Sequence, residues 1–269
     1  MTATSAQTAS PEPLLLRDAQ DGIVTLTLNR PAQYNALSVA LMAALQEQLD
    51  QIGADPEVRV VIIEGAGRGF CAGHDLAELR GAGGGRSFFE ALFQQCSALM
   101  ISLTRLPQPV IAKVHGVATA AGCQLVATCD LAVAAESARF GTPGVNIGLF
   151  CSTPMVALSR AVPRKTALRM LMTGDLLSAQ EAIGHGLVSH VVAEDELDQA
   201  TEDLARKVAD KSPLTLKIGK EAFYRQIELD LEAAYGYTAE VMTTNMLARD
   251  AEEGIDAFLE KRRPRWQGR

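Results

Sequence analysis

The sequence lacks any apolar run long enough to cross a bilayer, and it lacks an excess of positive charge. Its 269 residues carry 25 Lys and Arg against 32 Asp and Glu, which gives a formal net charge of −7. An acidic surface repels the phosphates of nucleic acids and of anionic lipids. A membrane-spanning helix needs about 20 apolar residues. We therefore expect neither a nucleic acid nor a membrane as a partner.

Paired cysteines and metal-ligand spacings are also missing. The cysteines are odd in number and scattered, and none forms a C-x-x-C pair. Disulfides and zinc are therefore poorly supported, and no G-x-S-x-G motif indicates a serine hydrolase. We expect four of the five to be small buried residues. They are Cys71, Cys96, Cys123 and Cys129, and Cys151 is the fifth.

The N-terminus contains no Lys or Arg within its first 13 residues and no apolar segment. This composition argues against both a secretory signal and an Arg-rich transit peptide. We therefore expect a disordered lead-in at residues 1–12 and a cytosolic location.

Strand and helix patterns alternate up to about residue 192, and only helical patterns follow. Ile23–Leu28 alternates as a strand does, Ser38 is suited to cap a helix, and Val58–Ile63 reads as a strand buried on both faces. The sequence therefore predicts an α/β core at residues 13–192 and a helical region at residues 193–269.

A strand followed by very small residues and then a helix occupies the middle of the chain. Val110–Val114 precedes the loop Gly116–Gly122, which opens onto a helical pattern. Amides at such a helix start have no partner and suit an oxygen that becomes negative. From spacing alone, an ordinary α/β crossing with ordinary turns is the favoured interpretation. A dinucleotide site at Gly65–Gly73 is disfavoured, because its third glycine is misplaced.

Two segments give the chain a specific resemblance. They are F-C-A-G-H-D-L at Phe70–Leu76 and A-A-G-C-Q-L-V-A-T-C-D at Ala120–Asp130. They resemble the signature segments of the crotonase superfamily, the enoyl-CoA hydratase/isomerase group. The resemblance covers nearly everything after residue 13, and the run Gly144–Pro154 is most similar to the branch called enoyl-CoA hydratase domain-containing protein 3. Further similar segments lie at Asn29–Leu37, Ala182–Val188 and Glu253–Arg262.

The resemblance implies a crotonase-like spiral of ββα units with a C-terminal helical trimerisation region. It also implies a homotrimer or dimer of trimers, and an acyl-CoA thioester as substrate with no other cofactor. The thioester oxygen would lie between the backbone amides of His74 and Ala121, although the family usually has Gly at the second position. One such donor is worth about 10²–10³ in rate.

The same resemblance assigns residues to the coenzyme channel. Phe258 and Lys261 would close the site, often from a neighbouring subunit, and the basic C-terminal run would offset phosphates. A solvated tail is the alternative for that run. The residues that would line the channel or lie near it are Arg30, Gln33, Ala72, His74, Asp75 and Leu76.

The chain departs from the family at the two positions that carry catalytic glutamates. Alignment places Gln124 at the first and Gly144 at the second. Glutamine cannot take up a proton near pH 7, and glycine has no side chain. Because a positioned acid or base contributes about 10²–10⁴ in rate, we expect efficient hydration to be lost.

Two other side chains offer substitutes. His74 either contributes only its N–H or acts through its imidazole, and histidine followed by Asp resembles the family's methylmalonyl-CoA decarboxylases. Cys151 either lines the acyl pocket or attacks thioesters from a helix start. The sequence thus predicts an enoyl-CoA hydratase-like, thioester-processing enzyme. The alternatives are a non-catalytic acyl-CoA-binding protein and a decarboxylase or thioesterase of the same superfamily.

Overall fold

The computed structural model describes residues 12–81, 83 and 85–269. The predicted lead-in at residues 1–12 therefore lies, except for residue 12, outside the described residues. Within the described part, no helix is long and apolar enough to span a bilayer.

A six-stranded sheet forms the centre of the core. Its order is β1-β2-β3-β4-β6-β9, with β1 antiparallel to β2 and every other pair parallel. Parallel strands covered on both faces are apolar throughout, as the fully buried run Val60–Ile63 shows. The strands are β1 (Leu15–Gln20), β2 (Ile23–Leu28), β3 (Val60–Gly65), β4 (Val110–Val114), β6 (Leu131–Ala135) and β9 (His190–Val192).

Three short strands form a second, smaller sheet. It contains β5 (Val117–Thr119), β7 (Arg139–Gly141) and β8 (Leu176–Ser178), with β7 in the middle. β5 follows β4 after two residues, and β7 follows β6 after three, so successive strands step from the large sheet to the small one. A helix follows β5, which makes the ββα unit expected of a crotonase-like spiral.

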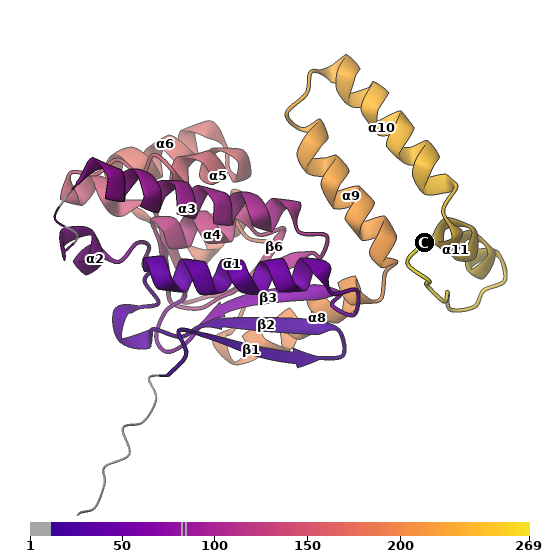
Figure 1. The fold of residues 1–269 in the computed structure, drawn as a ribbon, viewed down its shortest axis with the longest axis horizontal. Coiled ribbons are helices and arrows are strands. Elements are labelled where there is room, and N and C mark those ends of the chain that lie inside the picture. Colours follow the sequence, from indigo (N-terminus) through magenta and orange to yellow (C-terminus); the bar gives the residue numbers. More distant parts are fainter. Residues whose placement is uncertain (1–11, 82, 84) are drawn as a thin grey trace, which may run out of the picture.

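Helices cover both faces of the large sheet (Figure 1). α1 (Val39–Ala54), α3 (Arg86–Arg105) and α4 (Ala121–Thr128) pack on one face, and α8 (Leu197–Ala209) packs on the other. The Ser38 hydroxyl caps α1 by accepting a hydrogen bond from the Leu41 amide at 3.1 Å. The smaller helices are η1 (Pro31–Gln33), α2 (Leu76–Gly81), η2 (Pro143–Ile147), α5 (Pro154–Ala161), α6 (Arg164–Thr173), α7 (Ala179–Gly184) and η3 (Glu194–Glu196).

Three helices extend away from the core at the C-terminal end: α9 (Pro213–Gln226), α10 (Leu231–Met246) and α11 (Arg249–Leu259) (Figure 1). None of the residues of α10 is buried. Large apolar side chains lie open on this region, among them Leu231, Tyr235, Met242, Leu247, Phe258 and Leu259. An apolar surface of this extent is typical of an interface.

A buried polar cluster anchors α9 to the core. The Lys220 ammonium lies 2.6 Å from an Asp130 carboxylate oxygen and also donates to the carbonyls of Leu103 and Gln108 at 2.9 and 3.0 Å. The Tyr224 hydroxyl donates to the other Asp130 oxygen at 2.9 Å. Burial lowers the pKa of Lys220, and the adjacent Asp130 opposes that effect. Hydrogen bonds within the protein therefore replace the water contacts that the charged pair loses on burial.

We expect Lys220→Met to lower the free energy of unfolding by about 3 kcal/mol, because it leaves the Asp130 carboxylate buried without its cation. Chemical denaturation monitored by circular dichroism measures the effect. Lys217→Met, at an exposed position one turn earlier on α9, is the matched control and should change stability by less than about 0.5 kcal/mol. Equal stability of the two variants would contradict the anchoring role.

Candidate functional site

The loop that holds His74 lies between the segment at Leu37 and the strand β5. The Leu37 amide donates to the Gly73 carbonyl at 2.7 Å, and the Asp75 amide donates to the Leu37 carbonyl at 3.2 Å. These two bonds flank His74 without using its own N–H. On the other side, the Thr119 amide donates to the Cys71 carbonyl at 2.9 Å. The His74 amide itself makes no backbone hydrogen bond among the described residues.

Two glycines bring this loop against the start of α4. A Cβ on Gly73, whose φ is +96°, would lie 2.8 Å from the Ala120 Cβ and 3.2 Å from the Ala121 nitrogen. A Cβ on Gly122 would lie 2.1 Å from the Cys71 carbonyl oxygen. A side chain at Gly122 would overlap the Cys71 backbone, and one at Gly73 would be strained by the positive φ and would overlap the Ala120 methyl group. The segments carrying the His74 and Ala121 amides are thus in direct contact.

The start of α4 leaves its first amides without intrahelical partners. The helix begins at Ala121, and the Gln124 amide donates to the Ala120 carbonyl at 3.0 Å. The amides of the three residues before Gln124 therefore point out of the helix end. Ala120 has φ 49° and ψ −118°, a conformation that glycine adopts readily and alanine does not. The ψ angle of this strained residue sets the direction of the following N–H, that of Ala121.

The His74 imidazole is enclosed but unpartnered. Both ring nitrogens are buried, and neither has a hydrogen-bond partner among the described residues. The Phe93 ring packs edge-on against the imidazole, with centroids 5.6 Å apart. Burial lowers the pKa of His74, so the ring is neutral at pH 7. A neutral imidazole offers one donor and one acceptor to a bound ligand.

Gln124 and Gly144 occupy the positions that the resemblance reserves for carboxylates. Gln124 is 4% exposed, and the Cys96 thiol lies 3.9 Å from its side-chain oxygen. A Cβ on Gly144 would lie 2.5 Å from the Leu149 carbonyl oxygen and 2.7 Å from the Cys151 sulfur. The loop after Gly144 has therefore folded into the space that a side chain would occupy.

The Cys151 thiol is enclosed in that loop. Burial raises its pKa, and the opposing effect of the Gly144 backbone is smaller. A protonated thiol is a poor nucleophile. Its burial therefore disfavours the nucleophilic role.

The residues predicted to line the coenzyme channel mostly lie together. Arg30 and Asp75 form an ion pair at 2.7 Å, with side chains 16% and 13% exposed. That bond is the main cause of the lowered pKa of Asp75, which also caps α2 by accepting from the Ala77 and Glu78 amides. Arg30 and Asp75 thus hold the loop. Around this pair lie exposed Gln33 and Leu76 and half-buried Ala72, whose amide donates to the Tyr34 carbonyl at 2.9 Å.

Phe258 and Lys261 are not brought to this loop within one chain. Phe258 is 83% exposed on α11, which lies at the opposite end of the molecule from α2 (Figure 1). The basic tail beyond it is not a free, solvated segment. Arg262 forms ion pairs with Glu253 and Glu260, and the buried Asp250 carboxylate accepts hydrogen bonds from the Gln267 and Gly268 amides.

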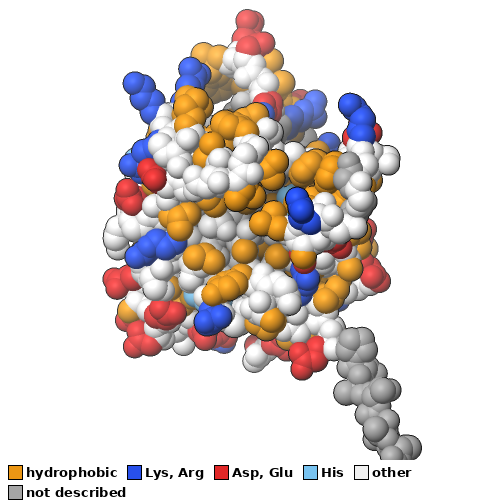
Figure 2. All heavy atoms as spheres, turned by 90° about the vertical axis from the view of Figure 1, so that its left-hand side faces the viewer, with side chains coloured by type: hydrophobic (Ala, Val, Ile, Leu, Met, Phe, Trp, Pro, Cys, Tyr) orange, Lys and Arg blue, Asp and Glu red, His pale blue; other side chains and the backbone are white. Residues whose placement is uncertain are grey.

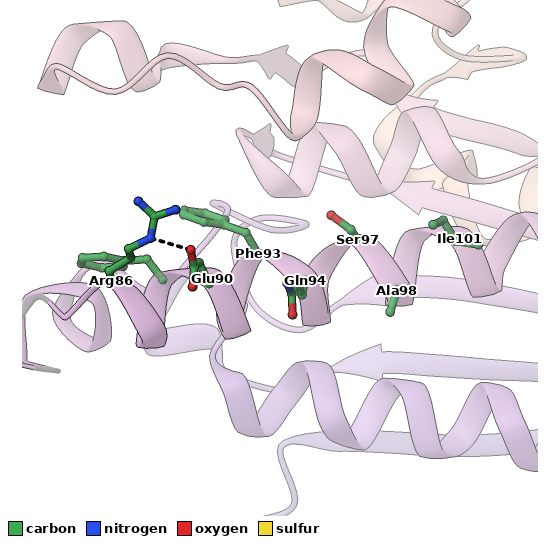
Figure 3. A pocket seen from close by; sticks show the side chains of 8 residues that line it. Arg86, Glu90, Phe93, Gln94, Ser97, Ala98 and Ile101 are labelled. Atoms are coloured by element: carbon green, nitrogen blue, oxygen red, sulfur yellow. Dashed lines mark hydrogen bonds and ion pairs between the residues drawn. The ribbon is translucent and has the colours of Figure 1, made fainter.

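An open, mainly apolar surface lies along α3 and was not expected from the sequence. It includes Phe93, Ser97 and Ile101. Figure 3 shows these three side chains on one side of α3, whereas Gln94 and Ala98 point to the other. The signal in the sequence was a second apolar stripe on α3, separate from the core stripe Leu92, Cys96, Leu99 and Leu103.

Exposed hydrophobic side chains gather on the face shown in Figure 2. The loop after Gly144 and the start of α5 supply Ile147, Leu149, Phe150 and Val156, which are 47–59% exposed. No group of three His, Cys, Asp or Glu residues placed to hold a metal ion occurs among the residues described. The site is therefore backbone amides, one neutral imidazole and apolar walls.

The chain is similar to known proteins along nearly its whole length. The family model described as enoyl-CoA hydratase/isomerase matches residues 18–269. The human protein named enoyl-CoA hydratase domain-containing protein 3, mitochondrial, is 49% identical over 258 residues, covering 96% of this chain and 84% of the relative. This similarity confirms the branch that Gly144–Pro154 predicted.

Two crystal structures show the same crotonase-like fold. An enoyl-CoA hydratase from Mycobacterium smegmatis has a TM-score of 0.92 and 54% identity, covering 95% of this chain and 99% of that one. The human enoyl-CoA hydratase domain-containing protein 3 has a TM-score of 0.91 and 48% identity, covering 94% and 100%. The predicted α/β fold, a spiral of ββα units followed by helices, is confirmed.

The expectation of a cytosolic location is wrong. The rat, mouse and human relatives all carry the word mitochondrial in their names. The expectation depended on the missing Lys and Arg in the first 13 residues, and N-terminal composition was too weak a signal to decide the compartment.

We expect Ala120→Gly to raise the free energy of unfolding by about 1 kcal/mol, because glycine relieves a strained conformation that costs about 1–3 kcal/mol while adding some entropy to the unfolded chain. Thermal and chemical denaturation measure the change. Ala127→Gly, at a regular helical position of α4, is the control and should lower stability by about 1 kcal/mol. A destabilised Ala120→Gly protein would show that the Ala120 methyl contact outweighs the strain.

Proposed function

The chain belongs to the enoyl-CoA hydratase/isomerase family, and from this premise we propose that it is an acyl-CoA-processing enzyme that stabilises negative charge on a thioester oxygen. The observation that carries the proposal is the contact between the His74 and Ala121 segments, enforced by Gly73 and Gly122. Two outward amides at such a junction suit an oxyanion, and each acts without reorganising when charge develops.

The reaction we propose needs little general acid or base catalysis by side chains. In this proposal Gln124 and Gly144 replace the glutamates of the usual hydratase, so charge stabilisation by the amides is the main catalytic term. Loss of carbon dioxide from a malonyl-type thioester leaves an enolate whose oxygen the amides hold, and the Cα then takes a proton. Slow hydration of an enoyl thioester, the reaction in many relatives' names, uses the same charge stabilisation.

The His74 imidazole is the side chain we assign to hydrogen bonding with the acyl group. Its two nitrogens have no partner within the described part of the chain, and leaving buried polar atoms unpaired costs about 1–3 kcal/mol. A ligand that pairs them recovers this free energy. The imidazole therefore favours substrates with a polar group beside the thioester, such as a malonyl-type carboxylate.

A second candidate is a non-catalytic acyl-CoA-binding protein. The observation in its favour is that neither Gln124 nor Gly144 carries an ionisable group. A thioesterase acting through Cys151 is disfavoured, since burial keeps that thiol protonated.

We also propose a homotrimer or a dimer of trimers. The exposed apolar side chains of α10 and α11 support an interface there, and Phe258 and Lys261 would then reach the coenzyme bound to a neighbouring subunit. The proposed substrate is an acyl-CoA thioester, with no separate cofactor.

Mass spectrometry of the purified protein with enoyl-, malonyl-type and saturated acyl-CoAs tests the function. We expect binding of the thioesters and either loss of carbon dioxide or gain of water in one class. His74→Ala should lower that turnover by about 10², whereas His115→Ala, whose ring nitrogen lies 2.9 Å from the Gly67 carbonyl, should not. Binding without any change in a thioester would favour the non-catalytic candidate.

Restoring the two carboxylates separately tests the assignment of positions 124 and 144. Gln124→Glu should fold normally and raise hydration of crotonyl-CoA by about 10² or more, whereas the near-isosteric Gln124→Met should not. Gly144→Glu should lower stability by about 1–3 kcal/mol, because its Cβ meets the Leu149 carbonyl. A Gly144→Glu protein as stable as the original would show that this loop rearranges freely.

A further inference from the structure

The last residues of the chain fold back along α11. The Lys261 backbone, with φ 56°, lies in the left-handed region that favours glycine, and the Arg262 amide donates to the Ala257 carbonyl at 3.0 Å. Together these features end a helix and reverse the direction of the chain. Residues 262–269, which we call the C-terminal strap, follow this turn and end beside α11 (Figure 1).

Two carboxylates of α11 hold the strap. The Asp250 carboxylate, in a residue that is 2% exposed, accepts from the Gln267 amide at 2.7 Å and from the Gly268 amide at 3.1 Å. The Glu253 carboxylate accepts from the Arg265 amide at 2.6 Å. Residues three apart lie on one face of a helix. The strap therefore runs antiparallel to α11 along the face that carries these two carboxylates.

Asp250 also connects the strap to the start of α9. The Ser212 hydroxyl caps α9 by accepting from the Thr215 amide at 3.1 Å, and it donates to the Asp250 carboxylate at 2.6 Å. The Trp266 indole donates to the Asp210 carbonyl, in the link between α8 and α9, at 2.7 Å. The strap and Asp250 together thus join α11 to the point where α9 begins.

α11 has little apolar packing of its own. Among its residues, all of which the structure describes, only Asp250 and Ala257 are buried, and Phe258 is 83% exposed. The strap supplies one of the apolar contacts, because a Cβ on Gly254 would lie 3.2 Å from the Trp266 ring. Apolar burial stabilises in proportion to the area buried. Within one chain, the position of α11 therefore depends chiefly on its hydrogen bonds to the strap.

We propose that the strap positions α11 for coenzyme binding and that Asp250 is the positioning residue through which it acts. Phe258 lies on α11 and Lys261 lies in the turn that begins the strap, so both move with this unit. They are the side chains that we assigned to the coenzyme of a neighbouring subunit, and the inference rests on that proposed function. Asp250 is enclosed by the strap and acts on the coenzyme only through these two residues.

The strap carries the only tryptophan of the sequence, Trp266, whose fluorescence reports whether the strap is bound. Asp250→Ala removes the acceptor of the Gln267 and Gly268 amides, so we expect the emission maximum to shift to longer wavelength and quenching by acrylamide to increase. Asp256→Ala, which removes a carboxylate from an exposed position of the same helix, should change neither. Unchanged emission in Asp250→Ala would contradict the anchoring of the strap by this carboxylate.

A double-mutant cycle on the full chain measures the positioning itself, with free coenzyme A as the ligand in titration calorimetry. Asp250→Ala alone, and Phe258→Ala combined with Lys261→Ala, should each weaken binding about tenfold, the worth of a hydrogen bond to a charged group. All three substitutions together should bind no more weakly than the Phe258 and Lys261 pair, because Asp250 acts through them. Asp256→Ala should stay within about twofold of the original protein.

A variant in the strap gives an independent measurement if Asp250→Ala does not fold. Gln267→Pro removes an amide that donates to Asp250 and leaves α11 unaltered. It should release Trp266 and weaken coenzyme A binding as Asp250→Ala does. Gln267→Ala, which keeps the amide, is its matched control and should bind as the original protein does.

The outcomes separate the inference from the function on which it rests. Failure of the original protein to bind coenzyme A would overturn the proposed function. Normal binding in the original protein, combined with undiminished binding in Asp250→Ala and Gln267→Pro, would overturn only the positioning role. Additive losses in the double-mutant cycle would also overturn that role, because Asp250 would then act on binding by another route.

Discussion

The close approach of the His74 loop to the start of α4 is the constraint on which the site depends. Gly73 and Gly122 allow backbone to meet backbone, and Ala120 adopts a strained conformation between them. A side chain at either glycine would push the two amides apart by the width of a methyl group. The spacing of these two amides is therefore determined by packing of the main chain, and the oxyanion site that we propose between them depends little on the neighbouring side chains.

α4 is held at both ends, and this links the site to the rest of the fold. Its first turn meets the His74 loop, and the Asp130 carboxylate, two residues after its last one, holds Lys220 and Tyr224 of α9. Asp130 also accepts a hydrogen bond from the Val110 amide at 2.7 Å, which ties the same cluster to β4.

The sequence predicted most of the large sheet and its helices because their apolar patterns are clear, but it missed β1, whose residues are mostly exposed. It also missed β5, β7 and β8, since three residues are too few to show an alternating pattern. The amides of His74 and Ala121 were predicted from a resemblance, and no periodicity indicates that their segments touch. The separation of Phe258 from the loop at Asp75 and the filling of the Gly144 space by Cys151 depend on tertiary contacts, which one sequence does not reveal.

A glycine in place of a carboxylate does not by itself leave an empty space. At Gly144 the Leu149 carbonyl oxygen and the Cys151 sulfur already lie in the volume that a side chain would occupy. At Gln124 the side chain keeps its length and its hydrogen-bonding ability but loses its charge. The two positions therefore differ in kind, because one preserves the geometry of a carboxylate and the other removes it. The chain has no carboxylate at either position to carry a proton, which is why charge stabilisation by backbone amides is the main term in the chemistry that we propose.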